Sequence, residues 1–179
     1  PTDAVYDADR GQIYVTNLDD GQVDILDIGG KALTGSLTYS GSDPDAIDIS
    51  MDGTTLVVAD GDTDTVQAID LATGQAGNSG TSGSTDHDPA DVVFRADGKV
   101  FVTHWTSAYS VYKQVDIFDP VDGSVTTPDG PAFEYCYMGR SDDYATFYQL
   151  GAAESGLYGV SRVDSDYNFE AVGGSMAEA

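Results

Sequence analysis

The sequence predicts an all-β fold, a β-propeller of about four blades, each a four-stranded antiparallel sheet. Two observations predict it. Short segments of alternating hydrophobic residues recur at a nearly constant spacing, and Asp-Gly pairs fall between them. Asp-Gly between two such segments is a strong hairpin signal, because glycine accepts a positive φ. Units of this length with four short strands and no helical periodicity are typical of propeller blades.

The most regular series predicts the second strand of each unit. Its members begin 43, 44 and 46 residues apart and read IYVTN (13–17), LVVAD (56–60), VFVTH (100–104) and TFYQL (146–150). A third-strand series follows each of these: VDILD (23–27), VQAID (66–70), VDIFD (115–119) and VSRVD (160–164). The repeated order predicts that every unit has the same strand sequence.

An inner strand is expected after a proline in each unit, at 3–6, 46–50, 91–95 and 134–138. The hairpin that follows it contains Gly in the first three units, whereas the fourth has Asp142 and Asp143 and no Gly. A fourth strand is expected at 32–39. The segment 76–84 is so polar and glycine-rich that we expect a loop there instead. The predicted blades are 1–40, 41–84, 85–130 and a degenerate 131–179.

Composition excludes several classes of function. The chain has 179 residues, 31 acidic against 7 basic, and a net charge of −24. Such a surface repels nucleic acid and disfavours an anionic membrane surface, and no apolar run is long enough to span a membrane. Acidity of this degree is tolerated when salt screens it, which indicates a halophilic or marine, extracellular setting. The alternative is an ordinary acidic secreted protein. The single Cys136 is expected to be a small core residue, with no internal disulfide.

The segment GQIYVTN, followed by GQVDILD, resembles the repeat of the YVTN-type β-propeller family. The likeness is clear over residues 1–125 and weak beyond. It implies a surface-layer or secreted protein, located extracellularly, at the cell surface or in the periplasm. Propellers of this family usually have seven blades, so four imply a fragment of a longer chain, a half-propeller completed by a partner, or a rare small propeller. The fragment, part of a seven-bladed propeller, is favoured. The implied partners are a protein, a glycan, or the remaining blades of the same or another chain.

The resemblance to other propellers places the ligand face where inner strands begin and second strands end. Candidate residues there are Asp43, Asp60 and Asp86. Both histidines of the chain, His87 and His104, fall on the same face of the third unit. Imidazole suits Cu or Zn. The alternative is that both histidines are ordinary loop residues.

The third unit has an enlarged loop after its second strand, which contains the only tryptophan. We expect Trp105, Tyr109 and Tyr112 to stack on a sugar or to cover a metal pocket. The segment 60–64 resembles the opening of a calcium loop, but Leu71 stands where the distal Glu ligand is required. It is read as a polar loop with at most a loose Ca contact.

Two functions follow from these observations. The first is a non-catalytic binding or scaffolding module at the cell exterior. The second is part of a copper-dependent periplasmic propeller oxidoreductase with His87 and His104 as ligands. Motifs of serine hydrolases, phosphate-binding loops, CxxC redox pairs and HExxH metalloproteases are absent from the sequence. The resemblance in fold favours the binding module.

Overall fold

The structure, a computed structural model, describes residues 2–82, 88–104, 115–128, 135–152, 159–164 and 169–171. Within these residues the chain is all-β and has no helix. The strands form four antiparallel sheets, and each sheet is built from four consecutive strands in sequence order. The prediction of an all-β fold made of four-stranded antiparallel units is therefore confirmed.

Each sheet lies within one of the predicted units. The first sheet contains β1 (Ala4–Asp7), β2 (Gln12–Asn17), β3 (Gln22–Asp27) and β4 (Ala32–Leu37). The second contains β5 (Pro44–Ile49), β6 (Thr55–Asp60), β7 (Thr65–Asp70) and β8 (Gln75–Thr81). The third contains β9 (Pro89–Phe94), β10 (Val100–His104), β11 (Asp116–Phe118) and β12 (Val125–Thr126). The fourth contains β13 (Tyr135–Arg140), β14 (Phe147–Ala152), β15 (Gly159–Val163) and β16 (Phe169–Ala171).

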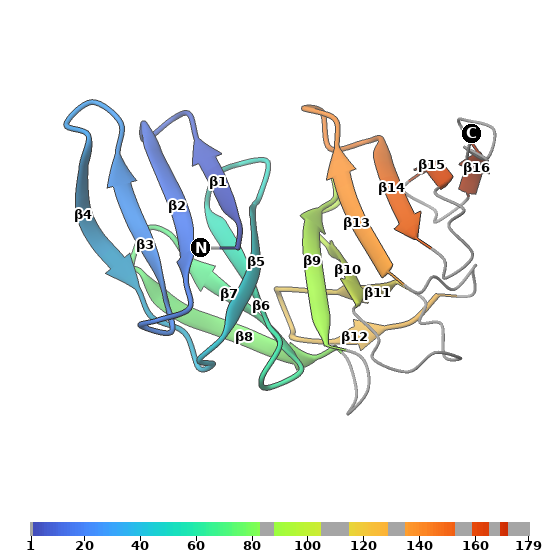
Figure 1. Ribbon diagram of the computed structural model, residues 1–179, viewed down its shortest axis with the longest axis horizontal. Coiled ribbons are helices and arrows are strands. Elements are labelled where there is room, and N and C mark those ends of the chain that lie inside the picture. Colours follow the sequence, from blue (N-terminus) through green and yellow to red (C-terminus); the bar gives the residue numbers. More distant parts are fainter. Residues whose placement is uncertain are drawn as a thin grey trace.

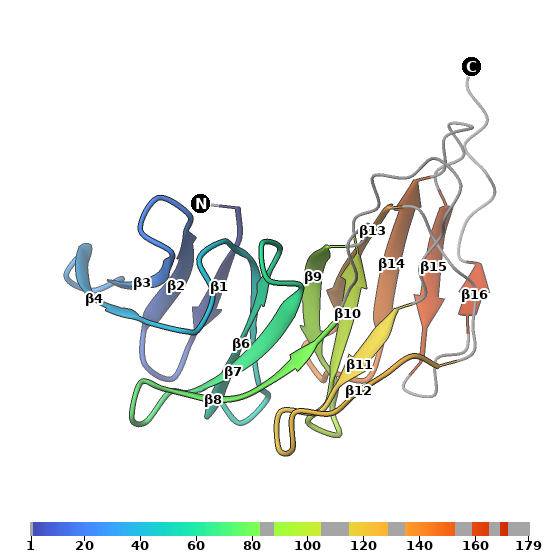
Figure 2. The same ribbon diagram turned by 90° about the horizontal axis from the view of Figure 1, so that it is seen from below.

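The four sheets stand side by side in sequence order, with the first and the fourth at opposite ends of the row (Figures 1 and 2). Their first strands β1, β5, β9 and β13 lie toward the middle, and consecutive ones contact each other. The last strands β4 and β16 lie at the two outer sides in Figure 1. The first strands therefore form a common inner wall.

Three hydrophobic clusters lie between consecutive sheets, because the middle strands bury both of their faces. In β6, Leu56 and Val58 pack toward the first sheet, whereas Val57 and Ala59 pack toward the third, and all four are fully buried. This is the two-residue period of a strand with apolar residues on both sides. The alternating segments seen in the sequence thus hold neighbouring sheets together.

Aspartate side chains join the inner strands of consecutive sheets. Asp3 accepts a hydrogen bond from the backbone N–H of Ile47 (2.9 Å), and Asp48 accepts one from Phe94 (2.8 Å). Asp91 accepts a hydrogen bond from the backbone N–H of Met138 (2.7 Å). We call Asp3, Asp48 and Asp91 the junction aspartates. Each connects a carboxylate of one sheet to the main chain of the next.

The fourth sheet also reaches the second. Arg140 donates from Nε and Nη2 to the two carboxylate oxygens of Asp48, at 3.0 and 2.9 Å. Tyr144 lies with its ring 3.6 Å from the Arg140 guanidinium carbon and donates its hydroxyl to the Ile49 carbonyl (3.0 Å). These contacts are a two-point hydrogen-bonded ion pair and a cation–π contact, both among the stronger polar interactions.

One strand prediction is wrong. The segment expected to be a loop at 76–84 contains most of β8, which pairs with β7. Its polar composition reflects an exposed outer strand. At Gly80 a side chain would clash with the Gly123 carbonyl and with Val125, so glycine is needed there to let the third sheet approach. The glycine content thus serves packing between sheets.

The fourth hairpin forms without glycine. Tyr144 occupies the place of Gly53 and Gly98 in the earlier turns, with φ of 57°. This left-handed conformation costs a non-glycine residue on the order of 1 kcal/mol or more. The hydroxyl bond to Ile49 and the burial of the ring (8% exposed) hold Tyr144 in that conformation.

Candidate functional site

Asp60, expected on the ligand face, lies at the end of β6 and is 1% exposed. Its Oδ2 accepts from the Tyr39 hydroxyl (2.6 Å) and from the backbone of Ser42 and Asp43, and its Oδ1 accepts from Thr63. Burial opposes ionisation, but the bonds from Tyr39 and Thr63 outweigh it and lower the pKa of Asp60. These bonds engage both carboxylate oxygens, so Asp60 anchors the segment that leads from the first sheet into the second.

Asp43 is half-buried beside Asp60, to which its backbone N–H donates. Burial, together with the charges of Asp62 and Asp60, raises the pKa of Asp43. Burial, together with the charges of Asp43 and Asp60, likewise raises the pKa of Asp45 to about 6. The loops at this end of the second sheet therefore carry a concentrated negative charge.

His104 ends β10 as Asp60 ends β6, and it is 4% exposed. Its Nε2 lies 3.1 Å from the Ser82 hydroxyl and 3.3 Å from Asp116 Oδ2. Ser82 also donates to Asp116 (3.0 Å), and Thr127 donates to the other oxygen of Asp116. A nucleophilic triad needs the serine and the acid on opposite imidazole nitrogens. Here the Ser82 hydroxyl and the Asp116 carboxylate lie on the same nitrogen, Nε2, inside the protein. His104, Ser82 and Asp116 therefore form a structural network.

The remaining predicted site residues fall outside the described residues: Asp86, His87, Trp105, Tyr109 and Tyr112. Within the described ranges, no group of three His, Cys, Asp or Glu side chains is placed to hold a metal ion. The pairing of His104 with His87 around copper or zinc stays a prediction, as does the loose calcium contact.

A cavity of about 560 Å³ opens on the inner wall and is lined by residues of all four sheets. Its acidic side chains are Asp3, Asp45 and Asp91, beside Ala46 and Met138. Burial raises the pKa of Asp91 to about 7, with the Asp3 and Asp48 charges adding to the effect. Burial likewise raises the pKa of Asp3. The inner wall therefore holds one carboxyl group, that of Asp91, that binds a proton near neutral pH.

This arrangement predicts a pH-dependent stability. Because the folded state holds a proton on Asp91 that the unfolded chain releases near 3.8, stability falls as pH rises from about 4 to about 7. In Asp91→Asn, the loss of unfolding free energy between about pH 5 and about pH 8 should be smaller than in the parent. Denaturant titrations at both values check this, with exposed Asp122→Asn as the control. Equal losses in parent and Asp91→Asn would contradict it.

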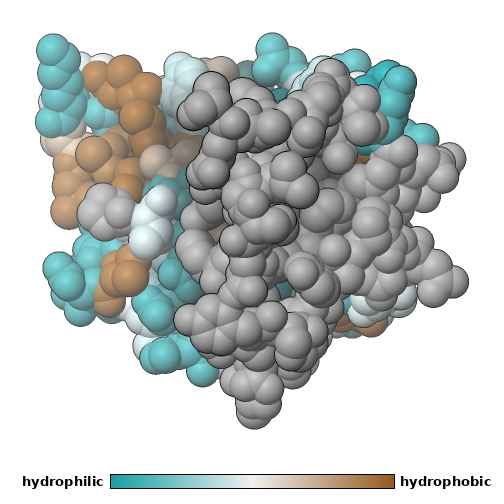
Figure 3. Space-filling model, turned by 45° about the vertical axis from the view of Figure 1, so that its right-hand side comes forward, coloured by the Kyte–Doolittle hydropathy of each residue, from teal (hydrophilic) through white to brown (hydrophobic). Residues whose placement is uncertain are grey.

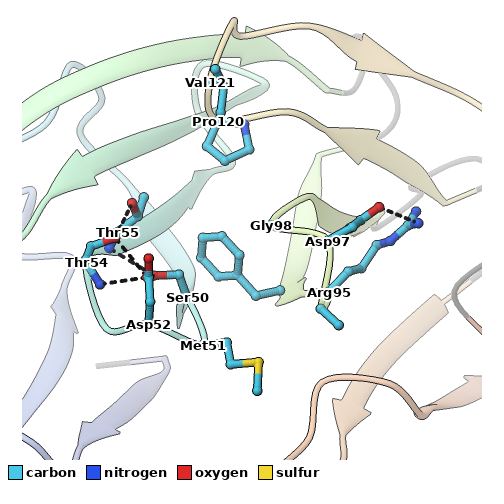
Figure 4. A pocket seen from close by; sticks show the side chains of 12 residues that line it. Ser50, Met51, Asp52, Thr54, Thr55, Arg95, Asp97, Gly98, Pro120 and Val121 are labelled. Carbon is cyan, nitrogen blue, oxygen red and sulfur yellow. Dashed lines mark hydrogen bonds and ion pairs between the residues drawn. The ribbon is translucent and has the colours of Figure 1, made fainter.

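A second cavity, of about 640 Å³, lies at the opposite end of the strands, between the hairpin turns of the second and third sheets (Figure 4). We call it the turn groove. Phe94 is among the residues that line it and is 1% exposed. Met51 and Val121 line it from two separate turns and are 62% and 84% exposed. Two exposed, large apolar side chains on turn tips around a hollow make a surface suited to an apolar group.

The rim of the turn groove is polar. Asp52 Oδ1 accepts from the Ser50 hydroxyl and from Thr54. These bonds, the Ser50 one foremost, lower the pKa of Asp52, so it is ionised at neutral pH. On the other side Arg95 pairs with Asp97 (2.9 Å). The lining thus carries one carboxylate more than it has cations.

Sequence reasoning overlooked the turn groove because it placed the ligand face at the other end of the sheets. One feature of the sequence does point to the turn groove. Met51 and Val121 occupy hairpin turns, where polar residues and glycine are the rule. Exposed hydrophobic side chains also gather elsewhere, in the brown patch at the left of Figure 3 among teal hydrophilic residues.

Comparison with known proteins identifies the fold and nothing narrower. No protein-family model matches the chain, and no curated protein matches it. Among solved structures it is similar to hydrazine synthase of Kuenenia stuttgartiensis, with a TM-score of 0.74 and 16% identity. The alignment covers 96% of this chain and 49% of that one, so the chain spans about half the neighbour's length. In the described part, no helix is long and apolar enough to cross a membrane.

Proposed function

We propose that this chain is a non-catalytic β-propeller module of the YVTN type that binds or scaffolds a protein partner outside the cell of a halophilic or marine organism. The observation that supports the proposal is the turn groove, which Phe94 and the exposed side chains of Met51 and Val121 line together. Asp60 and His104, at the other end of the strands, are by contrast engaged in hydrogen bonds within the chain.

The charge around the turn groove specifies the kind of partner. Asp52 is ionised at the rim, and the whole chain carries −24. An acidic partner is repelled by this field, whereas a basic one is attracted to it. The partner that fits is a peptide segment with a large apolar side chain next to lysine or arginine. The apolar residue would sit on Phe94 between Met51 and Val121, with the basic one near Asp52.

Calorimetric titration with two peptides tests this function. Acetyl-Lys-Phe-Lys-amide should bind at least about tenfold more tightly than acetyl-Glu-Phe-Glu-amide, because only the former complements the rim. Val121→Asn, which removes the apolar side chain without adding charge, should weaken the binding of the lysine peptide. Asp52→Asn should weaken binding of the lysine peptide, whereas Asp143→Asn, in the corresponding turn of the fourth sheet, should leave it unchanged. Equal or absent binding of the two peptides would overturn the proposal.

A salt dependence follows from the proposed setting. Self-repulsion of a surface with net charge −24 destabilises the folded chain, and mobile ions screen that repulsion. We expect the Tm to rise when NaCl increases from about 0.05 M to about 2 M, where the screening length is only a few ångströms. Calorimetric melts with NaCl, and with an equal osmolarity of sucrose as the control, check this. A Tm that does not rise would remove the halophile argument.

A further inference from the structure

The turn groove contains a side chain that oxidants can modify. Of the described residues that line the groove, Met51 alone contains sulfur. It is 62% exposed and belongs to none of the three hydrophobic clusters. Figure 4 shows its sulfur atom apart from the other labelled side chains of the groove. A dissolved oxidant can therefore reach the thioether of Met51.

The other methionine that the structure describes is protected from solvent. Met138 is 8% exposed and packs in the hydrophobic cluster between the third and fourth sheets. The third methionine of the chain, Met176, lies outside the described residues. Because oxidation of a side chain depends on its exposure to the oxidant, Met51 should react well before Met138.

The hairpin turn does not need an apolar side chain at position 51. In the second, third and fourth sheets, the turns 50–53, 95–98 and 141–144 close with the same hydrogen bond, from the N–H of the last residue to the carbonyl of the first. Met51 therefore corresponds to Ala96 in the third sheet and to Asp142 in the fourth. Since a small and a charged residue are both accepted there, a polar methionine sulfoxide fits the turn. Its effect should fall on binding in the groove and not on folding.

The charge of the chain favours a neutral oxidant, hydrogen peroxide. A net charge of −24 repels anionic oxidants, whereas it does not repel an uncharged peroxide molecule. The sulfur donates an electron pair to one peroxide oxygen and the O–O bond breaks. The leaving hydroxide takes the proton of the transferred hydroxyl, which gives one sulfoxide and one water. The sulfur is thereby oxidised by two electrons, and the apolar thioether becomes a polar group.

We propose that Met51 is a reversible oxidation site that switches partner binding in the turn groove. In the reduced chain, the Met51 thioether and Val121 offer apolar contacts to the large side chain of the partner. Oxidation replaces the first of these contacts with a polar sulfoxide, and a thiol-dependent methionine sulfoxide reductase restores it. The inference rests on the proposed binding function and adds a regulation to it.

Peptide mapping by mass spectrometry tests the oxidation site. Trypsin cleaves after lysine and arginine, so the three methionines fall in separate peptides, 32–95, 114–140 and 163–179. When the folded chain is treated with hydrogen peroxide, Met51 should gain one oxygen several times faster than Met138, in line with their exposed fractions of 62% and 8%. Saturating acetyl-Lys-Phe-Lys-amide should slow the oxidation of Met51 and leave that of Met138 unchanged.

Calorimetric titration before and after peroxide treatment tests the switch. The oxidised parent should bind acetyl-Lys-Phe-Lys-amide about fourfold or more weakly than the untreated parent, the loss that corresponds to about one buried methylene group. Reduction by both methionine sulfoxide reductases with dithiothreitol should restore the untreated affinity. Met51→Leu has no sulfur at this position, so its affinity should be the same before and after peroxide. Met138→Leu should respond to peroxide as the parent does.

Several outcomes would overturn the proposal. One is oxidation of Met51 no faster than that of Met138, and another is an oxidised parent with the untreated affinity. An equal loss of binding in peroxide-treated Met51→Leu would assign the effect to another residue. A lower Tm of the oxidised parent would contradict the tolerance of the turn. An untreated parent that does not bind the peptide would overturn the proposed function and this inference with it, and that result is seen before any peroxide is added.

Discussion

Replacing Asp48 with alanine is expected to lower the free energy of unfolding by about 3–5 kcal/mol, the range for breaking a buried ion pair by removing one partner. Asp48 accepts from Ile49 and Phe94 main-chain N–H groups and from two nitrogens of Arg140. Its side chain is 10% exposed and that of Arg140 is 18% exposed. Alanine leaves the guanidinium without its carboxylate and removes the acceptor that joins the second and third sheets. Denaturant titration measures the loss.

Two further variants make this result interpretable. Lys99→Ala removes an exposed ion pair with Asp119 (3.1 Å) and should cost less than about 1 kcal/mol. Asp48→Ala combined with Arg140→Met should be less destabilised than Asp48→Ala alone, because the unpaired cation is gone. A loss below about 1 kcal/mol for Asp48→Ala would contradict the role assigned to the pair.

Phe101→Ala should have an effect of similar size, about 3–5 kcal/mol, from lost burial and the cavity that remains. Phe101 is fully buried between the third and fourth sheets, in edge-to-face contact with Phe147 at a centroid distance of 4.9 Å. The Arg95 guanidinium lies 4.9 Å from the Phe101 ring centroid. Thermal and denaturant unfolding measure the change.

The matched comparisons for this site are a smaller apolar residue and an exposed one. Phe101→Leu keeps most of the volume and should lose clearly less stability than Phe101→Ala. Val121→Ala, at an 84% exposed position, should stay within about 0.5 kcal/mol of the parent. An equal loss in Phe101→Ala and Val121→Ala would show that the third and fourth sheets do not share a core.

The strands that sequence reasoning placed best are those with apolar residues on both faces. The second-strand series lies where it was predicted, with segments 13–17, 56–60 and 100–104 in β2, β6 and β10 respectively. A strand that is packed between two sheets has to be apolar on both of its faces, which makes it easy to recognise in the sequence. The exposed outer strand β8 has no such requirement, and one of its glycines, Gly80, leaves room for the third sheet. Composition alone therefore indicates a loop there.

The candidate sites were harder to predict than the strands. Asp60 and His104 lie at the expected ends of β6 and β10, but sequence position does not reveal which partners surround a side chain. Tyr39 and Ser82 come from the preceding connections and draw both groups into internal networks. The turn groove escaped prediction because it needs two turns, around Met51 and Val121, that are far apart in the sequence and meet only in the fold.

The junction aspartates have a consequence for how such a chain can change over time. Each junction takes a side chain from the earlier sheet and only a main-chain N–H from the later one, as in the pair of Asp91 and Met138. The junction bond itself therefore places no requirement on the side chain of the later residue. The fourth unit has lost its turn glycine and much of the repeat signature, yet its first strand is held in the same way as the others. A unit that replaces another would thus find the junction acid already in place upstream, and would have to match only the apolar cluster between the sheets.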